Sequence, residues 1–251
     1  MGERMMRLSA YLLTGSIAAA MASTPIAART PTGEQASLDQ VERHVEKAEA
    51  IEAIKRLTYA FGYYRDAFDH ERMLALFTDD ATYDFANGQY VGKSSLRRLF
   101  TSVRYSPGSR GVDEAGPALL SDHVFMQPVI TLAGDHRRAK ARFKEFVFQA
   151  EHGLSQTYAI GQFENDYVKT DSGAWKISAV RHCYRLMLPY DAAILELPEP
   201  APYEPAPTFY PAEPEGPDRQ SAFHCHRYPQ VGIDPPFHFD HPVTGERISK
   251  P

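Results

Sequence analysis

The chain has 251 residues, of which 43% are hydrophobic and 24% are charged, with 16 glycines and 19 prolines. These proportions exclude collagen-like, coiled-coil and wholly disordered proteins and favour a soluble chain with one substantial core. The formal net charge of -5 gives no strong electrostatic case for a nucleic acid or an anionic membrane, so we expect a small molecule as the partner. The two cysteines, Cys183 and Cys225, allow at most one disulfide, and the sequence leaves open whether they meet.

The N-terminus has the pattern of a secretory signal peptide. Arg4 and Arg7 precede a short apolar run, Leu8 to Ala22, and the favoured small-residue cleavage site ends at Ala28. The run is shorter and less apolar than a membrane-spanning helix. We therefore predict a signal peptide over residues 1–28, export to the periplasm or the cell exterior, and no membrane attachment after its removal.

Helical periodicity dominates the next part of the chain. From Ser37, where Ser-Leu-Asp-Gln fits a capping box, apolar residues recur at steps of three and four as far as Phe68. This pattern predicts one long amphipathic helix. Asp69 can cap a second, short helix that stops at Thr78-Asp79-Asp80.

Strand patterns follow the helices. A strand over residues 81–85, a turn at Asn87-Gly88 and a third helix over residues 94–103 are predicted first. Four long segments with strand character come next, over residues 122–132, 138–150, 155–169 and 174–188. Helices followed by a meander of long strands predict an α+β domain over residues 37–188, in which a strongly curved antiparallel sheet wraps the helices and leaves a cavity.

The composition changes abruptly after Leu188, because 14 of the 19 prolines lie from Pro189 onward. Proline excludes helix and central strand, so residues 189–251 should form an extended, Pro-rich arm. Its segments 223–226 and 237–241 hold five His or Cys donors, but the spacing matches no structural zinc motif and we predict no metal. The arm could pack on the sheet, on a neighbouring subunit, or over the cavity as a lid.

One acidic residue and one histidine are the candidates for chemistry. Tyr59, Tyr63 and Asp66 fall on the side of the long helix opposite its main apolar stripe, so its end should be enclosed, with Asp66 among aromatic rings. The alternatives place Asp66 in solvent or in the cap of the next helix. His123 begins a strand on the same side as Phe125, where a lone histidine is more often a core residue. Together, a carboxylate that fixes the imidazole tautomer and a free ring nitrogen suit proton transfer.

Three segments carry a resemblance to a known family. The sequence over residues 66–83, which includes Leu-Phe-Thr-Asp-Asp-Ala-Thr-Tyr, resembles the signature of SnoaL-like proteins in the nuclear transport factor 2-like superfamily. The strand that begins with His123 and runs into Gly134-Asp135, and the segment Gly173-Ala174-Trp175-Lys176-Ile177, are similar to the same family. The resemblance covers about residues 48–188. It implies a cone-shaped, curved antiparallel sheet around an N-terminal helix layer.

This family contains scytalone dehydratase, hexachlorocyclohexane dehydrochlorinase, bile acid dehydratase, ketosteroid isomerase and polyketide cyclases alongside non-enzymatic binding proteins, so the fold alone decides little. Resemblance to the dehydratase and dehydrochlorinase branch implies that Asp66 and His123 form a catalytic pair. Scytalone dehydratase has a second catalytic histidine in the strand where this chain offers Arg-Phe-Lys-Glu over residues 142–145. The acid that assists the leaving group therefore stays open among four candidates: Tyr63, Tyr83, Arg142 and Arg181.

We therefore predict a cofactor-independent lyase with His123 as general base and Asp66 as its orienting partner. It would eliminate water or another small group, or lose a small carbonyl such as formaldehyde, from a hydrophobic aromatic or polycyclic molecule. The predicted substrate-binding residues are Tyr59, Tyr63, Tyr83, Phe85, Phe125, Arg142 and Arg181. A homo-oligomer, dimer or trimer, is also expected. Two alternatives stay open: an isomerase, which uses the same base without a departing group, and a secreted non-catalytic protein that binds an apolar ligand.

Overall fold

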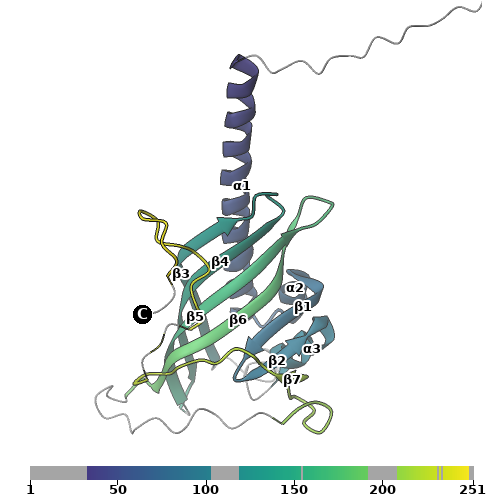
Figure 1. The fold of residues 1–251 in the computed structure, drawn as a ribbon. Coiled ribbons are helices and arrows are strands. Elements are labelled where there is room, and N and C mark those ends of the chain that lie inside the picture. The colour runs from purple at the N-terminus through teal and green to yellow at the C-terminus, as the bar shows by residue number, and fades with distance from the viewer. Residues whose placement is uncertain are drawn as a thin grey trace, which may run out of the picture. The chain divides into compact units, whose positions relative to one another are not determined.

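A computed structural model of the protein describes residues 33–102, 119–153, 155–191, 208–230, 232 and 234–248 (Figure 1). The described elements are α1 (Gly33–Asp66), α2 (His70–Ala75), β1 (Phe77–Phe85), β2 (Gly88–Val91), α3 (Gly92–Thr101), β3 (Leu119–Leu132), β4 (Arg138–Glu151), β5 (Ser155–Lys169), β6 (Trp175–Pro189) and β7 (Arg219–Gln220). The chain divides into a unit that ends at Val41 and a unit that begins at Glu42. The predicted signal peptide, residues 1–28, lies outside the described residues.

The helices agree with the predicted ones to within a few residues. α1 begins at Gly33, four residues before the predicted capping box, and ends at Asp66. Asp69 caps α2 as expected, because its side chain accepts a hydrogen bond from the backbone N–H of Arg72 at 3.0 Å. Among the described helices, none has a stretch long and apolar enough to cross a membrane.

β1 begins four residues earlier than predicted. Phe77 was expected to close the short helix, but it is fully buried and pairs with Ile177 of β6. The following hairpin turns on Ala86 and Asn87, whose φ angles are 48° and 66°, instead of on Asn87 and Gly88. Gly88 lies in β2, where an added Cβ would come within 2.3 Å of Pro217. Gly88 therefore allows the C-terminal arm to pack closely against β2, and it does not form the turn.

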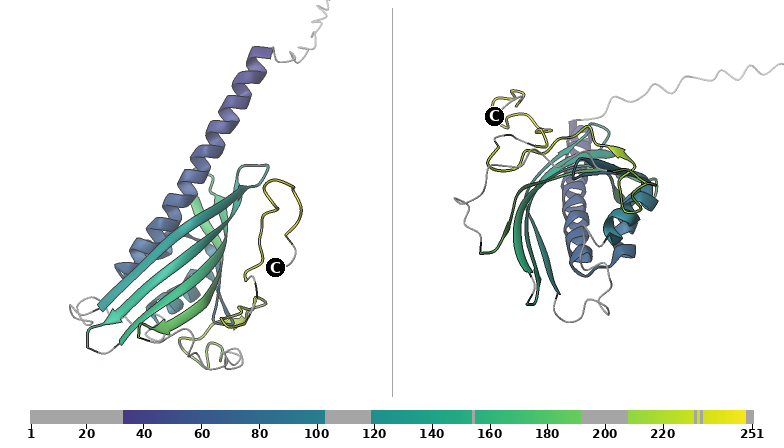
Figure 2. Two further views of the ribbon diagram at one scale, coloured as in Figure 1. Left: turned by 90° about the vertical axis from the view of Figure 1, so that its left-hand side faces the viewer. Right: turned by 90° about the horizontal axis from the view of Figure 1, so that it is seen from below.

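The seven strands form one sheet in the order β3-β4-β5-β6-β1-β2-β7. The long strands β3 to β6 pair in antiparallel fashion, as predicted, and curve around the part of α1 that follows Glu42 (Figure 2). β1 pairs with β6 in parallel, so the sheet is mixed and not wholly antiparallel. Alternating patterns predict strands, but they do not predict the direction in which segments distant in the chain will pair.

The core lies between the inner face of this sheet and the helices. Aromatic rings dominate it: Phe61 of α1 lies 5.7 Å from Phe77 and 6.1 Å from Phe125, measured between ring centroids. Gly62 lets the helix approach β3 closely, since a Cβ there would meet the Phe125 ring at 3.0 Å. This close approach brings the end of α1 onto the strand that carries His123.

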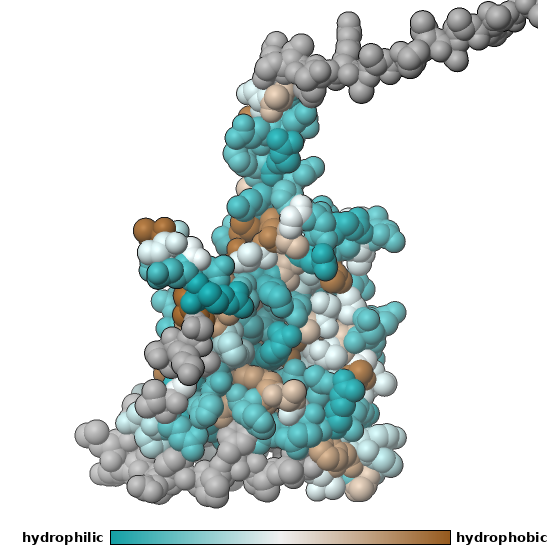
Figure 3. Space-filling model, in the orientation of Figure 1, coloured by the Kyte–Doolittle hydropathy of each residue, from teal (hydrophilic) through white to brown (hydrophobic). Residues whose placement is uncertain are grey.

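The described part of the arm packs on the outer face and the edge of the sheet, which answers one of the questions that the sequence left open. A disulfide joins Cys183 of β6 to Cys225, with their Cα atoms 5.5 Å apart. β7 adds to the sheet edge beside β2, and Arg185 donates a hydrogen bond to the carbonyl of Gly232 at 2.6 Å. The face that carries these strands and the arm is mostly hydrophilic in Figure 3.

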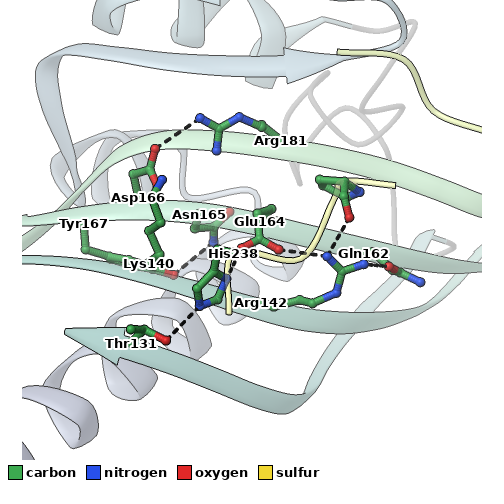
Figure 4. A network of polar contacts seen from close by, with 11 residues as sticks. Thr131, Lys140, Arg142, Gln162, Glu164, Asn165, Asp166, Tyr167, Arg181 and His238 are labelled. Carbon is green, nitrogen blue, oxygen red and sulfur yellow. Dashed lines mark hydrogen bonds and ion pairs between the residues drawn. The ribbon is translucent and has the colours of Figure 1, made fainter. Parts of the chain in front are cut away.

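A polar network fastens the arm to the middle strands (Figure 4). Arg142 of β4 donates hydrogen bonds to Glu164 at 2.8 Å and to the carbonyl of Pro235 at 2.7 Å, and its guanidinium lies 4.5 Å from the centroid of the Phe237 ring. His238 bonds to Glu164 through Nδ1 and contacts the hydroxyl of Thr131 through Nε2 at 3.2 Å. Each of these charged side chains is therefore paired where it is buried.

Candidate active site

The structure brings Asp66 and His123 together. Asp66 is the last residue of α1, and its Oδ1 lies 2.5 Å from Nδ1 of His123 in β3. The His123 side chain is 1% exposed and the Asp66 side chain is 19% exposed. Neither alternative for Asp66 agrees with this geometry, because the carboxylate is mostly buried and Asp69 makes the cap of α2.

Hydrogen bonding determines which nitrogen of His123 is available. Because Nδ1 faces a carboxylate, Nδ1 carries the proton and donates it to Asp66. Nε2 is buried and has no hydrogen-bond partner within the described part of the chain. Leaving a buried polar atom unpaired costs about 1–3 kcal/mol. A bound ligand that donates a hydrogen bond to Nε2 would remove this cost.

Burial lowers the pKa of His123, and the charge of Arg65 lowers it further. The hydrogen bond to Asp66 and the charge of Glu145 raise it by less. The imidazole is therefore neutral at pH 7, and the lone pair of Nε2 is free to accept a proton.

A cavity of about 300 Å³ lies beside this pair. Its lining consists of Tyr59, Tyr63, Asp66, Asp122, His123, Val124 and Phe125. Three predicted substrate-binding residues are thus next to the pair, with Tyr63 at the rim, where it is 75% exposed. The volume is at the lower end of the range for small-molecule sites.

Tyr83 and Phe85, also predicted to bind substrate, lie around a second and smaller cavity. This cavity measures about 30 Å³ and is lined by Arg65, Met73, Tyr83, Phe85, Leu99, Phe100 and His182. Arg65 precedes Asp66 directly in α1, so the last turn of one helix supplies side chains to both cavities.

The sequence analysis did not find Glu145 and His182, which form a second carboxylate–imidazole pair. Nε2 of His182 lies 2.9 Å from Oε2 of Glu145, and Arg65 donates to Oε1 of Glu145 at 3.0 Å. Both side chains of the pair are almost wholly buried. An added Cβ at Gly161 would lie 2.6 Å from Glu145, so this glycine makes the space for the pair. The sequence did contain a signal for this pair. Glu145 is two residues after Phe143, so strand alternation places this acidic residue on the buried inner face, where an acidic residue is unusual.

His182 and Arg65 keep Glu145 ionised. Burial alone would raise the pKa of Glu145, but its interactions with His182 and Arg65, which include a hydrogen bond from His182, outweigh burial and bring the pKa to about 2. Burial lowers the pKa of His182 more than Glu145 raises it. A neutral ring next to an ionised carboxylate leaves Nε2 of His182 as the donor and Nδ1 as an acceptor.

Arg142 and Arg181 do not reach either cavity, which corrects the expectation that they bind substrate. Side chains alternate along a strand, and Phe143 and His182 point inward, so Arg142 and Arg181 point outward. Arg142 contacts the arm, and Arg181 donates to Asp166 at 3.2 Å (Figure 4).

The histidines and the cysteine of the arm have other partners. Cys225 is bonded to Cys183, His226 pairs with Asp234, and His238 pairs with Glu164. Within the ranges that the structure describes, no three His, Cys, Asp or Glu side chains gather so as to hold a metal ion.

Comparison with known proteins places the chain in a family. A family model described as the SnoaL-like domain matches residues 46–181, more than half of the 251 residues. A hexachlorocyclohexane dehydrochlorinase, LinA type 2, is 16% identical over 60% of this chain and 95% of its own, with a TM-score of 0.50. The LinA-type3 dehydrochlorinase from Novosphingobium barchaimii LL02 is 15% identical over 60% and 96%, also with a TM-score of 0.50.

An NTF2-like protein with a cystatin-like fold from Novosphingobium aromaticivorans is 18% identical over 62% of this chain and 92% of its own, with a TM-score of 0.47. No curated protein matches the chain. At these identities the similarity to solved structures shows the fold alone. The family model and the fold confirm the resemblance that the motifs predicted, and the chain belongs to the SnoaL-like domain family.

Proposed function

We propose that the protein is a cofactor-independent lyase that eliminates water or another small group from a hydrophobic aromatic or polycyclic molecule. The observation that carries this proposal is the buried Asp66–His123 pair with an unpartnered Nε2. Membership of the SnoaL-like family and a fold shared with dehydrochlorinases support an acid–base reaction without a cofactor.

In this mechanism, Nε2 of His123 takes a proton from a carbon atom of the substrate. The electron pair of the broken C–H bond forms a double bond, and the bond to the departing group breaks. Asp66 accepts the Nδ1–H hydrogen bond throughout, which holds the ring in place and stabilises the imidazolium. Where water is lost, His123 gives the proton that it took from carbon to the departing hydroxide, which restores the neutral ring. Where the group leaves as an anion, His123 returns this proton to solvent after the product leaves.

The surroundings of the pair support a substrate without a carboxylate. Tyr59, Tyr63 and Phe125 offer aromatic contact area around the larger cavity. The cation nearest to the pair along α1, Arg65, is already engaged by Glu145. Asp66 adds a negative charge at the same place. A carboxylate would therefore be repelled there, whereas a neutral aromatic molecule would not.

The disulfide supports export of the mature protein. Disulfides persist in oxidising compartments such as the periplasm and the cell exterior. The bond between Cys183 and Cys225 therefore agrees with the predicted signal peptide over residues 1–28. We propose that the enzyme works in one of these compartments.

Substitution of His123 tests the proposal. Ligands would first be found by melting-temperature shifts against phenolic dimers, steroids and terpenoids, and turnover would then be followed by mass spectrometry. General acid–base groups contribute about 10² to 10⁴-fold, so His123→Ala should lower kcat by that factor. His136→Ala, in the β3–β4 hairpin, is the matched control. Equal turnover of His123→Ala and the wild type would exclude this mechanism.

An isomerase is the second candidate, because the buried base is shielded from water. A shielded base can return the same proton to another carbon of the substrate. In heavy water, an isomerase gives a product of unchanged mass apart from any deuterium it takes up, whereas a lyase gives a lighter product. Tight binding with no product at all would instead support the non-catalytic alternative.

A further inference from the structure

The end of α1 needs side-chain contacts to hold it in place. Asp66 is the last residue of the helix, and the chain then turns at Phe68, whose φ angle is 52°. This left-handed conformation is unfavourable for a residue with a bulky side chain. Residues at a helix end also lack part of the backbone hydrogen bonding that fixes the helix interior. The position of the Asp66 carboxylate therefore depends on the contacts that the side chains of the last turn make.

Arg65, the residue before Asp66, fastens this turn to two strands. Its guanidinium donates one hydrogen bond to Oε1 of Glu145 in β4 at 3.0 Å and another to the hydroxyl of Tyr184 in β6 at 3.1 Å. The Arg65 side chain is 18% exposed, and the Glu145 side chain is fully buried. Two bonds from one planar group fix its orientation, which a single ammonium group does not achieve. Arg65 thus joins the end of α1 to the inner face of the sheet.

Glu145 is itself held in one position. Its Oε2 accepts a hydrogen bond from Nε2 of His182 at 2.9 Å, so each carboxylate oxygen has its own donor. The His182 ring stacks on Phe163 at 4.1 Å and on Phe85 at 5.2 Å, with interplanar angles of 17° and 19°. Rings packed in this way have little freedom to turn. The carboxylate to which Arg65 bonds is therefore a rigid anchor.

The same helix end makes the contact with His123. Oδ1 of Asp66 lies 2.5 Å from Nδ1 of His123 in β3, so the last turn of α1 is tied to three strands through two consecutive side chains. Catalytic groups must be held within about 0.5 Å of their productive positions, and a misplacement of about 1 Å can cost about 100-fold in rate. Loosening of Arg65 would therefore disturb the contact between Asp66 and His123.

The charges of Arg65 and Glu145 oppose each other at His123. Arg65 lowers the pKa of His123, and Glu145 raises it. Because the two charged groups are bonded to each other, their effects at His123 partly cancel. The larger contribution of this ion pair to the site is the position that it gives to Asp66.

We propose that Glu145 is a positioning residue for the Asp66–His123 pair. Held by His182, Glu145 fixes Arg65, and Arg65 places the Asp66 carboxylate on Nδ1 of His123. The effect on reaction rate rests on the proposed function, because a misplaced Asp66 slows turnover only if His123 is the base. The contact between Asp66 and His123 can be measured without a substrate, so the two proposals can fail separately.

Proton NMR of the full-length mature protein with isotope-labelled histidine tests this role of Glu145. A ring proton bonded to a carboxylate gives a signal far downfield of the backbone amides, and the signal that disappears in His123→Ala belongs to Nδ1 of His123. In Glu145→Gln this signal should move upfield or broaden. On a substrate found by the ligand screen, kcat should fall by about 10- to 100-fold. KM should change little, because neither Glu145 nor Arg65 lines the larger cavity. An unchanged His123 signal in folded Glu145→Gln would overturn the proposal.

Glu164→Gln is the matched control. Glu164 is also a buried glutamate that pairs with an arginine and a histidine, Arg142 and His238, but on the outer face of the sheet. Its replacement should leave the His123 signal and kcat unchanged. An equal change of the His123 signal in both variants would indicate general loosening of the fold and contradict a positioning role for Glu145.

A second variant serves if Glu145→Gln does not fold, because removing one partner of a buried ion pair is strongly destabilising. Arg65→Lys keeps the positive charge beside Glu145, but an ammonium group lacks the planar fork that bonds to both Glu145 and Tyr184. The His123 signal should again move or broaden. A signal and a kcat equal to those of the wild type would mean that the charge alone is needed, and the positioning role would be rejected.

The His123→Ala variant separates this inference from the lyase mechanism. Wild-type turnover in His123→Ala, together with a changed His123 signal in Glu145→Gln, would reject the lyase mechanism and leave the positioning of Asp66 in place.

Discussion

Both faces of the long strands carry imidazole rings paired with carboxylates, but the hydrogen bonding of His238 on the outer face differs from that of His123 on the inner face. On the outer face, Arg142, Glu164 and His238 form a network in which both nitrogens of the imidazole have partners. On the inner face, His123 is paired with Asp66 at one nitrogen only. A carboxylate next to an imidazole therefore does not by itself indicate catalysis. What distinguishes His123 is a ring nitrogen without a hydrogen-bond partner among the described residues, in a side chain that lines a cavity.

This contrast assigns different roles to the two faces. Changes to the inner pairs should act on rate and pH dependence, because those groups transfer the proton or hold the groups that do. Changes on the outer face should act on stability, because those groups hold the arm to the sheet.

Asp66→Asn should give the largest effect. An amide can still face Nδ1, but it does not stabilise the imidazolium or enforce the tautomer, so kcat should fall by about 10² to 10⁴-fold. Steady-state kinetics on a substrate found by the ligand screen would measure the loss. Asp171→Asn, a fully exposed carboxylate, is the control and should behave as wild type. Comparable rates for Asp66→Asn and Asp171→Asn would contradict the role of Asp66.

Removal of the disulfide should produce the largest effect on the outer face. Cys183 and Cys225 are 42 residues apart, and a closed loop of that length stabilises the folded state by up to about 4 kcal/mol. The double variant Cys183→Ala/Cys225→Ala should lose stability of this order in denaturant unfolding while kcat stays near the wild-type value. A large loss of kcat in a folded double variant would show that the arm also serves the inner face.

Acidification should destabilise the protein through the inner pairs. Burial keeps the pKa values of His123 and His182 below the unfolded value of about 6.5, so the unfolded chain binds more protons as pH falls below that value. The pKa of Glu145, about 2 against an ordinary 4.5, acts in the same direction as pH falls below 4.5. Glu145 alone should account for a loss of about 2 kcal/mol between pH 4.5 and pH 3, and the two histidines should add to it. Glu145→Gln should flatten the lower part of this slope, and an unchanged slope would contradict the ionised state of Glu145.

Arg181→Ala should have the smallest effect. Arg181 pairs with Asp166 on the outer face, and the two side chains are 32% and 25% exposed. Pairs as accessible as this one contribute less than about 1 kcal/mol. The melting temperature should change little and KM not at all. An increase in KM would mean that Arg181 contacts the substrate after all.

Much of the fold could be predicted because local patterns repeat over many residues. The bounds of β5 agree with the predicted strand, and those of β4 and β6 agree to within one residue, since period-two alternation and turn residues are local signals. Asp66 and His123 were found through a family motif, while spacing alone left Asp66 open to a place in solvent. Glu145 and His182 were missed, because neither lies in a recognisable motif and their meeting depends on the register of three strands.

The amino-acid pattern by itself determined which segments are helix, strand and arm, and which residue types are available for proton transfer. Only the tertiary structure decided that β1 runs parallel to β6, that Cys183 meets Cys225, and that Arg142 faces the arm. The physical reason is that local preference depends on neighbours within a few residues, whereas a contact between distant segments depends on strand register. A shift of one residue in that register moves a side chain from one face of the sheet to the other.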